Sequence, residues 1–560
     1  MKRLLSILCS VGSLFAFAKD KNEIKEHFVA MRDGVKLYTM VSIPENSQKL
    51  PVIVIRSPYA QYTKKEVAKL MRRYRKSPQF GYALVVQHCR GTGKSEGEFI
   101  PYINEKNDGL DLLEWVRKQN FYNGEIYLSG GSYLASVQAA ILNVPQPDIR
   151  GCFFAVQDSE RYNIIYRNGF MRLKLHASWY VNVYKIKSVK RTKKAARFET
   201  FPLAGITPKI FGEKAADFEE ALLHPDRNDP FWKTPGYGGG EFSDALVNSQ
   251  IPIMLIGSWH DIYISGMFDI WRKLTPEHKK KCVFIVTPFE HAYMRRRKGI
   301  HHSLTSPGGS PLELLPGKDL NYQWFDHVRG GALPEQIKKG EITRYQLFGG
   351  KWLTAPDVGS NSVMQKFYLS GKRTLSAIPV ENGKISYDYD PRNPAEFKGG
   401  CDGVFGGVEL QDAPNSHPDI ISFVTDKFEK DMVLEGACKV KLHVSSTAPD
   451  SCFYARLSIV KPDGTLGLRH DIDSICRTNP EFKANGEAVI DLTMAPHNFK
   501  IARGEALRLD VSSSCWPFFQ LHSNYKGNQA LQTKTQVARN TIITGKSFIE
   551  IPFSESGGEK

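Results

Sequence analysis

Short apolar runs rich in valine and isoleucine constrain the fold of this chain most strongly. They lie at residues 52–55, 83–87 and 126–128. Runs of this length and composition are typical of strands buried on both faces of a parallel sheet. Between the last two runs, Leu110, Leu113 and Val116 recur at helical spacing. Strands that alternate with a helix indicate βαβ units, and therefore a mostly parallel sheet covered by helices.

The 560 residues are too many for one ordinary core, so further units are expected. From about 151 to 245, aromatic residues, asparagine and lysine dominate, with few strand candidates. Strand-like runs then return at 253–256 and 283–286. We interpret residues 151–245 as a helical cap inserted into one sheet domain, which residues 19–150 and 246–335 form. Such insertions commonly shape binding sites.

The last part of the chain, residues 336–560, has a different pattern. Segments such as 439–444 and 507–511 alternate polar and apolar residues, and glycine, proline and aspartate punctuate them. This pattern is typical of an antiparallel β-sandwich.

Two serines are candidates for a catalytic nucleophile. Residues 93–97 match the literal pattern Gly-x-Ser-x-Gly around Ser95. A nucleophile elbow, however, needs a strand, a tight turn and then a helix, and residues typical of a loop follow Ser95. Ser132 follows the run 126–128 and two glycines, and it precedes small and apolar residues that can form a buried helix. We therefore favour Ser132, with a glycine-rich structural turn as the alternative.

Residues 91–95, Gly-Thr-Gly-Lys-Ser, also look like the end of a phosphate-binding loop. The full pattern requires a glycine where this chain has His88, and a helix must follow. Neither requirement is met, so we do not expect nucleotide binding.

Candidates for an acid and a base follow the two later strands. A serine hydroxyl needs a base, and that base needs an orienting carboxylate. Asp261 follows the run 253–256 and His291 follows 283–286, so their order along the chain is that of α/β-hydrolases. His260 is an alternative base, which we disfavour because it precedes the acid and is adjacent to it. A hydrogen-bonded loop histidine is the alternative interpretation of His291.

The N-terminus predicts export. Lys2 and Arg3 precede an apolar stretch at residues 4–17, and residues 16–18 form a small-x-small cleavage signal. The stretch is too short to span a bilayer comfortably, so residues 1–18 predict a signal peptide and a secreted or periplasmic protein. No later segment is apolar enough to predict a membrane span.

The formal net charge is +16, but lysine and arginine are spread along the whole chain. Residues 185–197 contain seven of them, which we interpret as a solvated helix face of the cap rather than a nucleic-acid site. Residues 295–298, Arg-Arg-Arg-Lys, could attract anionic substrates.

The nine cysteines include no Cys-x-x-Cys pair, so we expect neither zinc nor a redox site. Cys152, Cys282 and Cys438 lie in or beside strand-like runs and are expected to be buried thiols.

Several motifs then occur in a specific order. They are Arg56-Ser57-Pro58-Tyr59, residues 90–97, Gly130-Gly131-Ser132-Tyr133, Trp259-His260-Asp261 and Pro288-Phe289-Glu290-His291. In this order they resemble the CocE/NonD hydrolases, a family of cocaine esterases, α-amino-acid ester hydrolases and X-Pro dipeptidyl-peptidases. Residues 324–327 are similar to the family's helix before its last domain, and residues 495–517 to its C-terminal jelly-roll. The resemblance covers nearly the whole chain after residue 18 and does not specify a substrate.

The resemblance implies an α/β-hydrolase domain with a helical cap and a jelly-roll domain. It implies that Ser132 is the nucleophile, with Asp261 and His291 as its triad partners. The Tyr59 phenol and the backbone N–H of Tyr133 would donate to the oxyanion, which needs preorganised donors. From the residues alone, Tyr59 would be interpreted as a turn aromatic after a proline. No metal or organic cofactor is implied.

The chain also departs from the family pattern. The family usually has glycine at Ala135 and an aspartate near His88. Its amino-acid ester hydrolases bind the substrate ammonium through acidic residues just after the triad aspartate, but residues 262–265 contain none. Asp158 and Glu160, at the start of the cap, could still supply a carboxylate.

We therefore expect a serine hydrolase that cleaves an ester or amide acyl bond through an acyl-enzyme. Its substrate would be a small molecule or a short peptide. An X-Pro dipeptidyl-peptidase is one alternative, and a non-catalytic protein that binds glycans or surfaces through the sandwich is another. The oligomeric state is left open.

Overall fold

The computed structural model describes most of the chain. The described residues are 24–44, 49–59, 63–68, 81–183, 200–212, 214–233, 241–291, 320–400 and 407–554. The expected signal peptide at 1–18 and the basic segments 185–197 and 295–298 lie outside them. Within the described residues, no helix is both long and apolar enough to cross a membrane.

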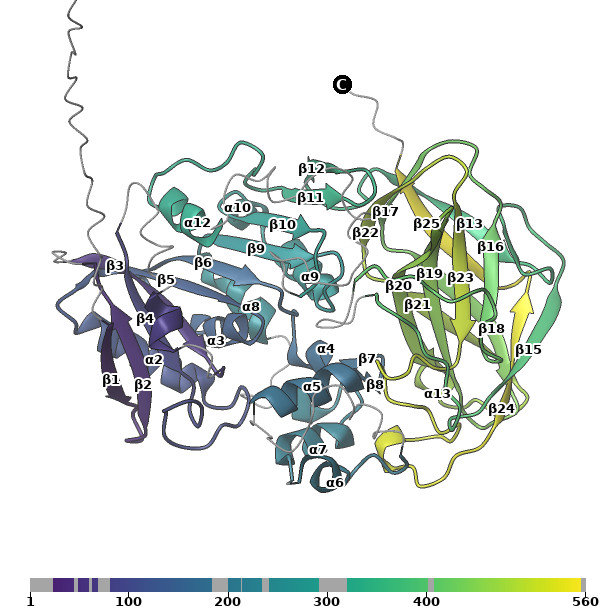
Figure 1. Cartoon of the computed structure of the whole chain (residues 1–560), viewed down its shortest axis with the longest axis horizontal. Coiled ribbons are helices and arrows are strands. Elements are labelled where there is room, and N and C mark those ends of the chain that lie inside the picture. Colours follow the sequence, from purple (N-terminus) through teal and green to yellow (C-terminus); the bar gives the residue numbers. More distant parts are fainter. Residues whose placement is uncertain are drawn as a thin grey trace, which may run out of the picture.

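A mixed sheet of ten strands forms the first domain (Figure 1). Its order is β1-β2-β4-β3-β5-β6-β9-β10-β11-β12. The strands are β1 Ile24–Ala30, β2 Lys36–Ser42, β3 Leu50–Ser57, β4 Ala83–His88, β5 Tyr122–Gly131, β6 Ile149–Ala155, β9 Ile253–Ser258, β10 Val283–Thr287, β11 Ile342–Gln346 and β12 Lys351–Ala355. Neighbours from β4 to β11 pair in parallel, and the pairs at both edges are antiparallel. The expected α/β-hydrolase sheet is thus confirmed.

The central strands are buried on both faces because helices cover both. Val52 and Val54 of β3 pack in the same cluster as the helices α2 (Glu105–Arg117) and α3 (Tyr133–Leu142). Ile53 and Ile55 point to the other face and pack in the cluster of α12 (Leu320–Val328). Successive strand residues alternate between faces, so a run without polar residues is what such a doubly covered strand requires.

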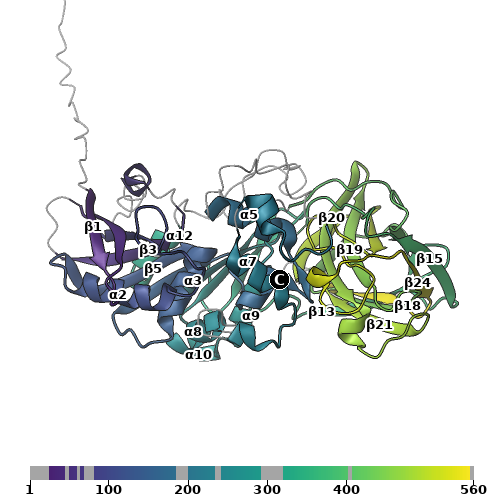
Figure 2. The same cartoon turned by 90° about the horizontal axis from the view of Figure 1, so that it is seen from below.

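The helical insertion between β6 and β9 forms a cap beside the sheet (Figures 1 and 2). Its elements are α4 Arg161–Ile165, β7 Tyr166–Arg167, β8 Phe170–Met171, α5 Leu173–Val183, α6 Thr207–Phe211, α7 Ala216–Leu223, the 3-10 helix Pro230–Lys233 and α8 Glu241–Ser249. Residues 151–155, which the sequence analysis places in the cap, belong to sheet strand β6. Likewise the sheet continues past residue 335, through β11 and β12.

The C-terminal domain is a mostly antiparallel β structure, as expected. Its strands are β13 Ser362–Leu369, β14 Thr374–Ser376, β15 Gly383–Tyr389, β16 Ile421–Thr425, β17 Met432–Gly436, β18 Lys439–Ser446, β19 Cys452–Lys461, β20 Gly464–Ser474, β21 Glu487–Thr493, β22 His497–Ile501, β23 Ala506–Ser512, β24 Ala538–Thr544 and β25 Phe548–Ser554. In β18, Val440, Leu442 and Val444 are buried and alternate with more exposed residues. In β23 the alternating Arg508 and Asp510 are also buried, because they pair with each other at 2.9 Å.

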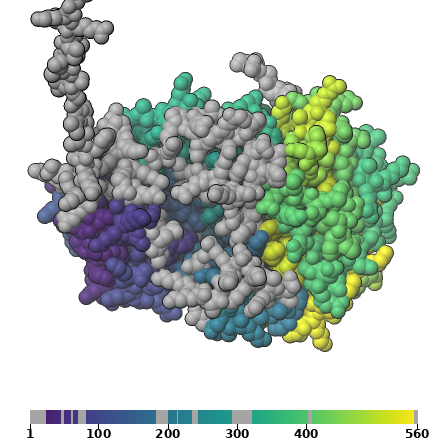
Figure 3. Space-filling model, in the orientation of Figure 1, coloured from purple at the N-terminus to yellow at the C-terminus, as the bar shows by residue number. Residues whose placement is uncertain are grey.

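The cap and the C-terminal domain are in direct contact (Figures 2 and 3). The Arg167 guanidinium binds both carboxylate oxygens of Asp471, at 2.7 and 2.8 Å. Gln520 donates its backbone N–H to the carbonyl of Met171 at 3.0 Å. Two-pronged arginine–carboxylate bonds are directional as well as strong, so they fix the orientation of the cap relative to the β domain.

Cys152, Cys282 and Cys438 form no disulfide. Cys152, Cys282 and Cys438 are fully buried, with exposed fractions of 0%, 0% and 2%. The expectation of buried thiols at these three positions is therefore confirmed.

Candidate active site

Ser132 occupies a strained turn between β5 and α3. Its φ of 58° and ψ of −133° are rare for a residue with a side chain. Its N–H donates to the carbonyl of Ala155 in the next strand at 2.9 Å, which holds the turn in place. A Cβ on Gly130 would lie 2.5 Å from the Cβ of Leu134, so only glycine allows the helix to approach so closely. Strand, strained serine and helix together form a nucleophile elbow.

Ser95 lies in a compact loop instead. Its hydroxyl donates to the carbonyl of His88 at 2.9 Å and accepts the N–H of Tyr38 at 2.9 Å. A Cβ on Gly93 would lie 1.9 Å from Nδ1 of His88, so this glycine is needed for close packing. The glycines that resemble a phosphate-binding loop thus serve to fold the loop against strand β4.

Asp261 and His291 meet just beyond the carboxyl ends of β9 and β10. Oδ2 of Asp261 lies 2.5 Å from Nδ1 of His291. Oδ1 of Asp261 accepts the N–H of Tyr263 at 2.7 Å, and only 1% of the Asp261 side chain is exposed. The His291 side chain is 23% exposed. A buried carboxylate bound to Nδ1 orients the ring and leaves Nε2 available for proton transfer.

The other candidate base, His260, faces away from this pair. Its ring is 1% exposed and lies 5.6 Å from the ring of His497 in β22. Burial and then the charge of Arg469 lower the pKa of His260 to about 3. A histidine that is neutral and enclosed at the domain contact is unsuited to accept a proton from the nucleophile.

Tyr59 follows β3 and brings its phenol to the elbow. Burial raises the pKa of Tyr59, and hydrogen bonds with the side chains of Trp179 and Ser132 act against that rise. The indole N–H of Trp179 donates to the Tyr59 hydroxyl at 3.2 Å. The phenol therefore stays protonated near neutral pH and lies beside the serine hydroxyl.

The backbone N–H of Tyr133 is the second candidate donor. Tyr133 is the first residue of α3, and the first N–H groups of a helix have no acceptor within that helix. The helix dipole adds partial positive charge at this end. An oxygen anion that forms on a group attached to Ser132 would thus meet donors from Tyr59 and from Tyr133.

Several residues around the elbow were missed by the sequence analysis. Trp179 comes from cap helix α5, and Tyr263 packs its ring 5.6 Å from that of His291. Tyr102 packs against Tyr133 with the two rings tilted and their centroids 4.7 Å apart, and it has a φ of 71°. Glu105 accepts a hydrogen bond from the phenol of Tyr133. No local motif identifies Trp179, Tyr102 and Glu105, and Tyr263, although it follows Asp261 closely, is recognised only by its contact with the ring of His291.

The cap carboxylates Asp158 and Glu160 are both engaged. Asp158 accepts the backbone N–H of Ser159 at 2.7 Å, and Glu160 lies 2.7 Å from the guanidinium of Arg227. Burial raises the pKa of Asp158 to about 7, and the charge of Arg172 opposes this rise. Both carboxylates therefore already interact with other groups of the protein.

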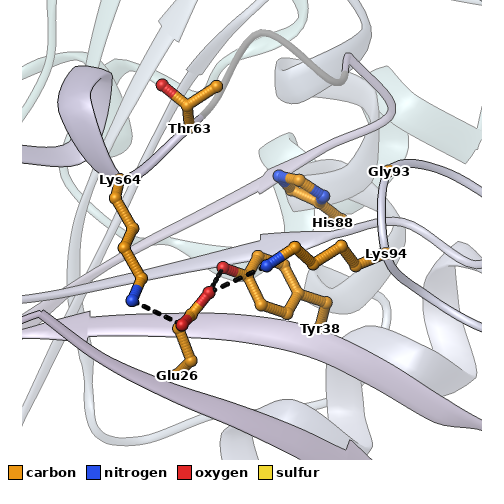
Figure 4. Close-up of a pocket in the computed structure, with 7 residues that line it drawn as sticks. All are labelled: Glu26, Tyr38, Thr63, Lys64, His88, Gly93 and Lys94. Carbon is orange, nitrogen blue, oxygen red and sulfur yellow. Dashed lines mark hydrogen bonds and ion pairs between the residues drawn. The ribbon is translucent and has the colours of Figure 1, made fainter.

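A pocket of about 440 Å³ lies away from the elbow, between β1, β2 and the loop after β4 (Figure 4). Its lining comprises Glu26, Tyr38, Thr63, Lys64, His88, Gly93 and Lys94. Glu26 interacts there with Lys64 at 2.5 Å, with Lys94 at 3.0 Å and with the hydroxyl of Tyr38. These interactions lower the pKa of Glu26 to about 2. The pocket contains none of the residues of the elbow or of the Asp261–His291 pair.

Two family models match this chain. The model of the X-Pro dipeptidyl-peptidase (S15 family) matches residues 33–293. The model of the X-Pro dipeptidyl-peptidase C-terminal non-catalytic domain matches residues 337–548. Their order agrees with the order of the sheet domain and the β domain along the chain.

Characterised proteins with similar sequences or folds include hydrolases. Cocaine esterase of Rhodococcus sp. (strain MB1 Bresler) is 25% identical over a 556-residue alignment, which covers 89% of this chain and 92% of the esterase. A solved α-amino acid ester hydrolase has a TM-score of 0.77 at 18% identity, covering 96% and 98% of the two chains. A CocE/NonD family hydrolase from Staphylococcus aureus has a TM-score of 0.64 at 18% identity, covering 95% and 93%.

Asp158→Asn should change how stability depends on pH. The folded wild type keeps the Asp158 proton up to a pKa of about 7, whereas the unfolded chain loses it near 3.8. The unfolded state therefore binds fewer protons above pH 4, and wild-type stability falls as the pH rises toward 7. Relative to the non-titrating variant, the wild type should lose about 3 kcal/mol between pH 5 and pH 8. Urea denaturation at both pH values measures this difference.

Asp491→Asn is the matched control, because the Asp491 side chain is 65% exposed on β21. Its free energy of unfolding should change between pH 5 and pH 8 by the same amount as that of the wild type. If the free energy of unfolding of Asp158→Asn also changes by that amount, Asp158 is not held protonated by its surroundings.

Proposed function

We propose, from the premise that the chain belongs to the CocE/NonD family of hydrolases, that it cleaves ester or amide acyl bonds through Ser132. The observation that carries this proposal is the 2.5 Å contact between Asp261 and His291, beyond strands that are parallel to the strand of the Ser132 elbow.

In the proposed reaction, Nε2 of His291 accepts the proton of the Ser132 hydroxyl as its oxygen attacks the acyl carbonyl. Asp261 holds the ring at Nδ1 and stabilises the imidazolium. The Tyr59 phenol and the Tyr133 N–H donate to the oxyanion of the tetrahedral intermediate. His291 then gives its proton to the leaving alkoxide or amine, and the acyl group remains on Ser132.

A water molecule completes the cycle. His291 removes a proton from the water, whose oxygen attacks the acyl-enzyme carbonyl, and the same two donors stabilise the second oxyanion. When this intermediate collapses, His291 returns the proton to Oγ of Ser132 and the carboxylic acid is released.

The state of the cap carboxylates favours esters and simple amides over N-terminal dipeptides. A dipeptidyl-peptidase has to bind a free α-ammonium at a fixed distance from the scissile bond. Such binding needs an available carboxylate, but burial raises the pKa of Asp158 to about 7, which leaves it only partly ionised near neutral pH, and Glu160 pairs with Arg227. An X-Pro dipeptidyl-peptidase remains the second candidate, because the matching family model carries that description.

The N-terminal sequence supports a further part of the proposal, that the protein is exported. A positively charged start, an apolar stretch and a small-x-small motif precede residue 19. The substrate would then be met outside the cytoplasm.

Ser132→Ala should abolish both covalent labelling by a fluorophosphonate probe and ester hydrolysis. Loss of the nucleophile removes the acyl-enzyme route, and kcat should fall by at least about 10³-fold. Labelling is read on a gel, and hydrolysis is followed with 4-nitrophenyl esters. Ser95→Ala is the matched control and should label like the wild type. Equal labelling of Ser132→Ala would contradict the mechanism and point to another nucleophile, whereas a wild type that does not label would favour a non-catalytic protein.

A substrate panel separates the two enzymatic candidates. The wild type should hydrolyse 4-nitrophenyl acyl esters with a kcat/KM at least about tenfold above that for Gly-Pro-4-nitroanilide, since Asp158 and Glu160 are both engaged with other groups of the protein. N-acetylation of the dipeptide substrate, which removes its charge, should not lower the rate further. A strong preference for the unacetylated dipeptide would instead establish the dipeptidyl-peptidase.

A further inference from the structure

The side chain of Tyr133 is anchored deep in the domain. It is 2% exposed, and its phenol donates to Oε1 of Glu105 at 2.9 Å. The same phenol accepts the backbone N–H of Tyr102 at 2.8 Å. Burial, and then the Glu105 carboxylate, raise the pKa of Tyr133, so the phenol remains a donor. Tyr133 is thus fixed at two points, by its backbone in the elbow and by its hydroxyl.

Glu105 in turn belongs to a buried ion pair with Arg56. Oε2 of Glu105 lies 3.0 Å from Nη2 of Arg56, and the two side chains are 5% and 1% exposed. Nη1 of Arg56 donates to the main-chain carbonyl of Glu105 at 2.7 Å, and its Nε donates to Gln87 at 3.0 Å. The guanidinium therefore ties strand β3 both to helix α2 and to strand β4.

Arg56 lies in β3, three residues before Tyr59, which follows the end of that strand at Ser57. The N–H of Tyr59 donates to the hydroxyl of Ser57 at 3.1 Å, which fixes the turn between the strand and the phenol. One ion pair is thus connected to both candidate oxyanion donors, to Tyr59 along β3 and to Tyr133 through its phenol.

We propose that the Arg56–Glu105 pair is a positioning element that sets the two oxyanion donors relative to each other. This inference rests on the proposed acyl-transfer mechanism. Oxyanion donors act only when they are held about 2.7–3.1 Å from the developing charge. A buried ion pair costs desolvation and is weak evidence of a role in stability alone. Here it has a geometric role, because it ties the strand of one donor to the side chain of the other.

Tyr133→Phe tests the link without breaking the ion pair or removing the backbone donor. With the phenolic anchor lost, the N–H of residue 133 should be held less well, and kcat for a 4-nitrophenyl ester should fall about tenfold or more. KM should stay within about twofold, because the anchor serves the transition state and not the bound substrate. Affinity for a trifluoromethyl ketone, which forms an oxyanion on Ser132, should fall in proportion to kcat/KM.

Tyr389→Phe is the matched control. The Tyr389 phenol is fully buried and donates to the carbonyl of His522 at 3.2 Å within the β domain. This variant loses a similar buried hydrogen bond far from the elbow, and its kcat should remain within about twofold of wild type.

Glu105→Gln keeps an acceptor for the phenol of Tyr133 but removes the charge that holds Arg56, so it should lower kcat in the same way as Tyr133→Phe.

An unchanged kcat in Tyr133→Phe, or a raised KM with unchanged kcat, would overturn the positioning role. Such a result leaves the mechanism standing as long as Ser132→Ala abolishes labelling. If Ser132→Ala labels like the wild type, the proposed function itself fails, so the two failures are distinguishable. If Glu105→Gln does not fold, the trifluoromethyl ketone series on Tyr133→Phe still decides the question.

Discussion

Parallel hydrogen bonding between β5, β6, β9 and β10 is the constraint on which the site depends. Because these strands run in the same direction, the residues after their carboxyl ends come to the same edge of the sheet. Ser132, Asp261 and His291 follow β5, β9 and β10, so Ser132 comes to the same edge as two groups that lie more than 120 positions later in the sequence. Ligand sites at the carboxyl ends of strands are a general property of such sheets.

The turn at Ser132 adds a local backbone constraint to the one that parallel strand pairing imposes on the whole sheet. The positive φ of Ser132 is tolerated because Gly130, two residues earlier, allows α3 to pack closely and because β6 accepts the Ser132 N–H. The cap then contributes Trp179 to the Tyr59 phenol, and bonds such as Arg167–Asp471 hold the cap against the β domain. The β domain therefore contributes to the site indirectly, by fixing the element that encloses it.

The central strands of the sheet were predictable from the pattern of apolar residues in the sequence. Valine- and isoleucine-rich runs mark the central strands, because burial on both faces leaves no room for polar residues. Strand β6 was not placed in the sheet, although Cys152 was assigned to a strand-like run, since Arg150 and Gly151 shorten its apolar sequence. The edge strands β1, β2, β11 and β12 were missed as well. In β23, Arg508 and Asp510 alternate with apolar residues, a pattern that predicts a solvent-exposed face. The structure shows that both side chains are buried, because they form an ion pair with each other.

The site was predictable only in part. Residues that follow strands can be found from local patterns, as with Ser132, Asp261 and His291. Tyr59 was found only through the family resemblance, and Glu105 and Trp179 not at all, because their roles arise from contacts made after the chain folds. Arg56 and Glu105 are 49 positions apart, and no spacing rule connects them.

A structure of the protein after reaction with a phosphonate inhibitor tests the central claim most directly. The account predicts a covalent bond from phosphorus to Oγ of Ser132, with the phosphoryl oxygen about 3 Å from both the Tyr59 hydroxyl and the Tyr133 nitrogen. Nε2 of His291 should lie within hydrogen-bonding distance of Oγ or of the leaving-group oxygen. An adduct on another residue, or a phosphoryl oxygen that meets neither donor, would contradict it.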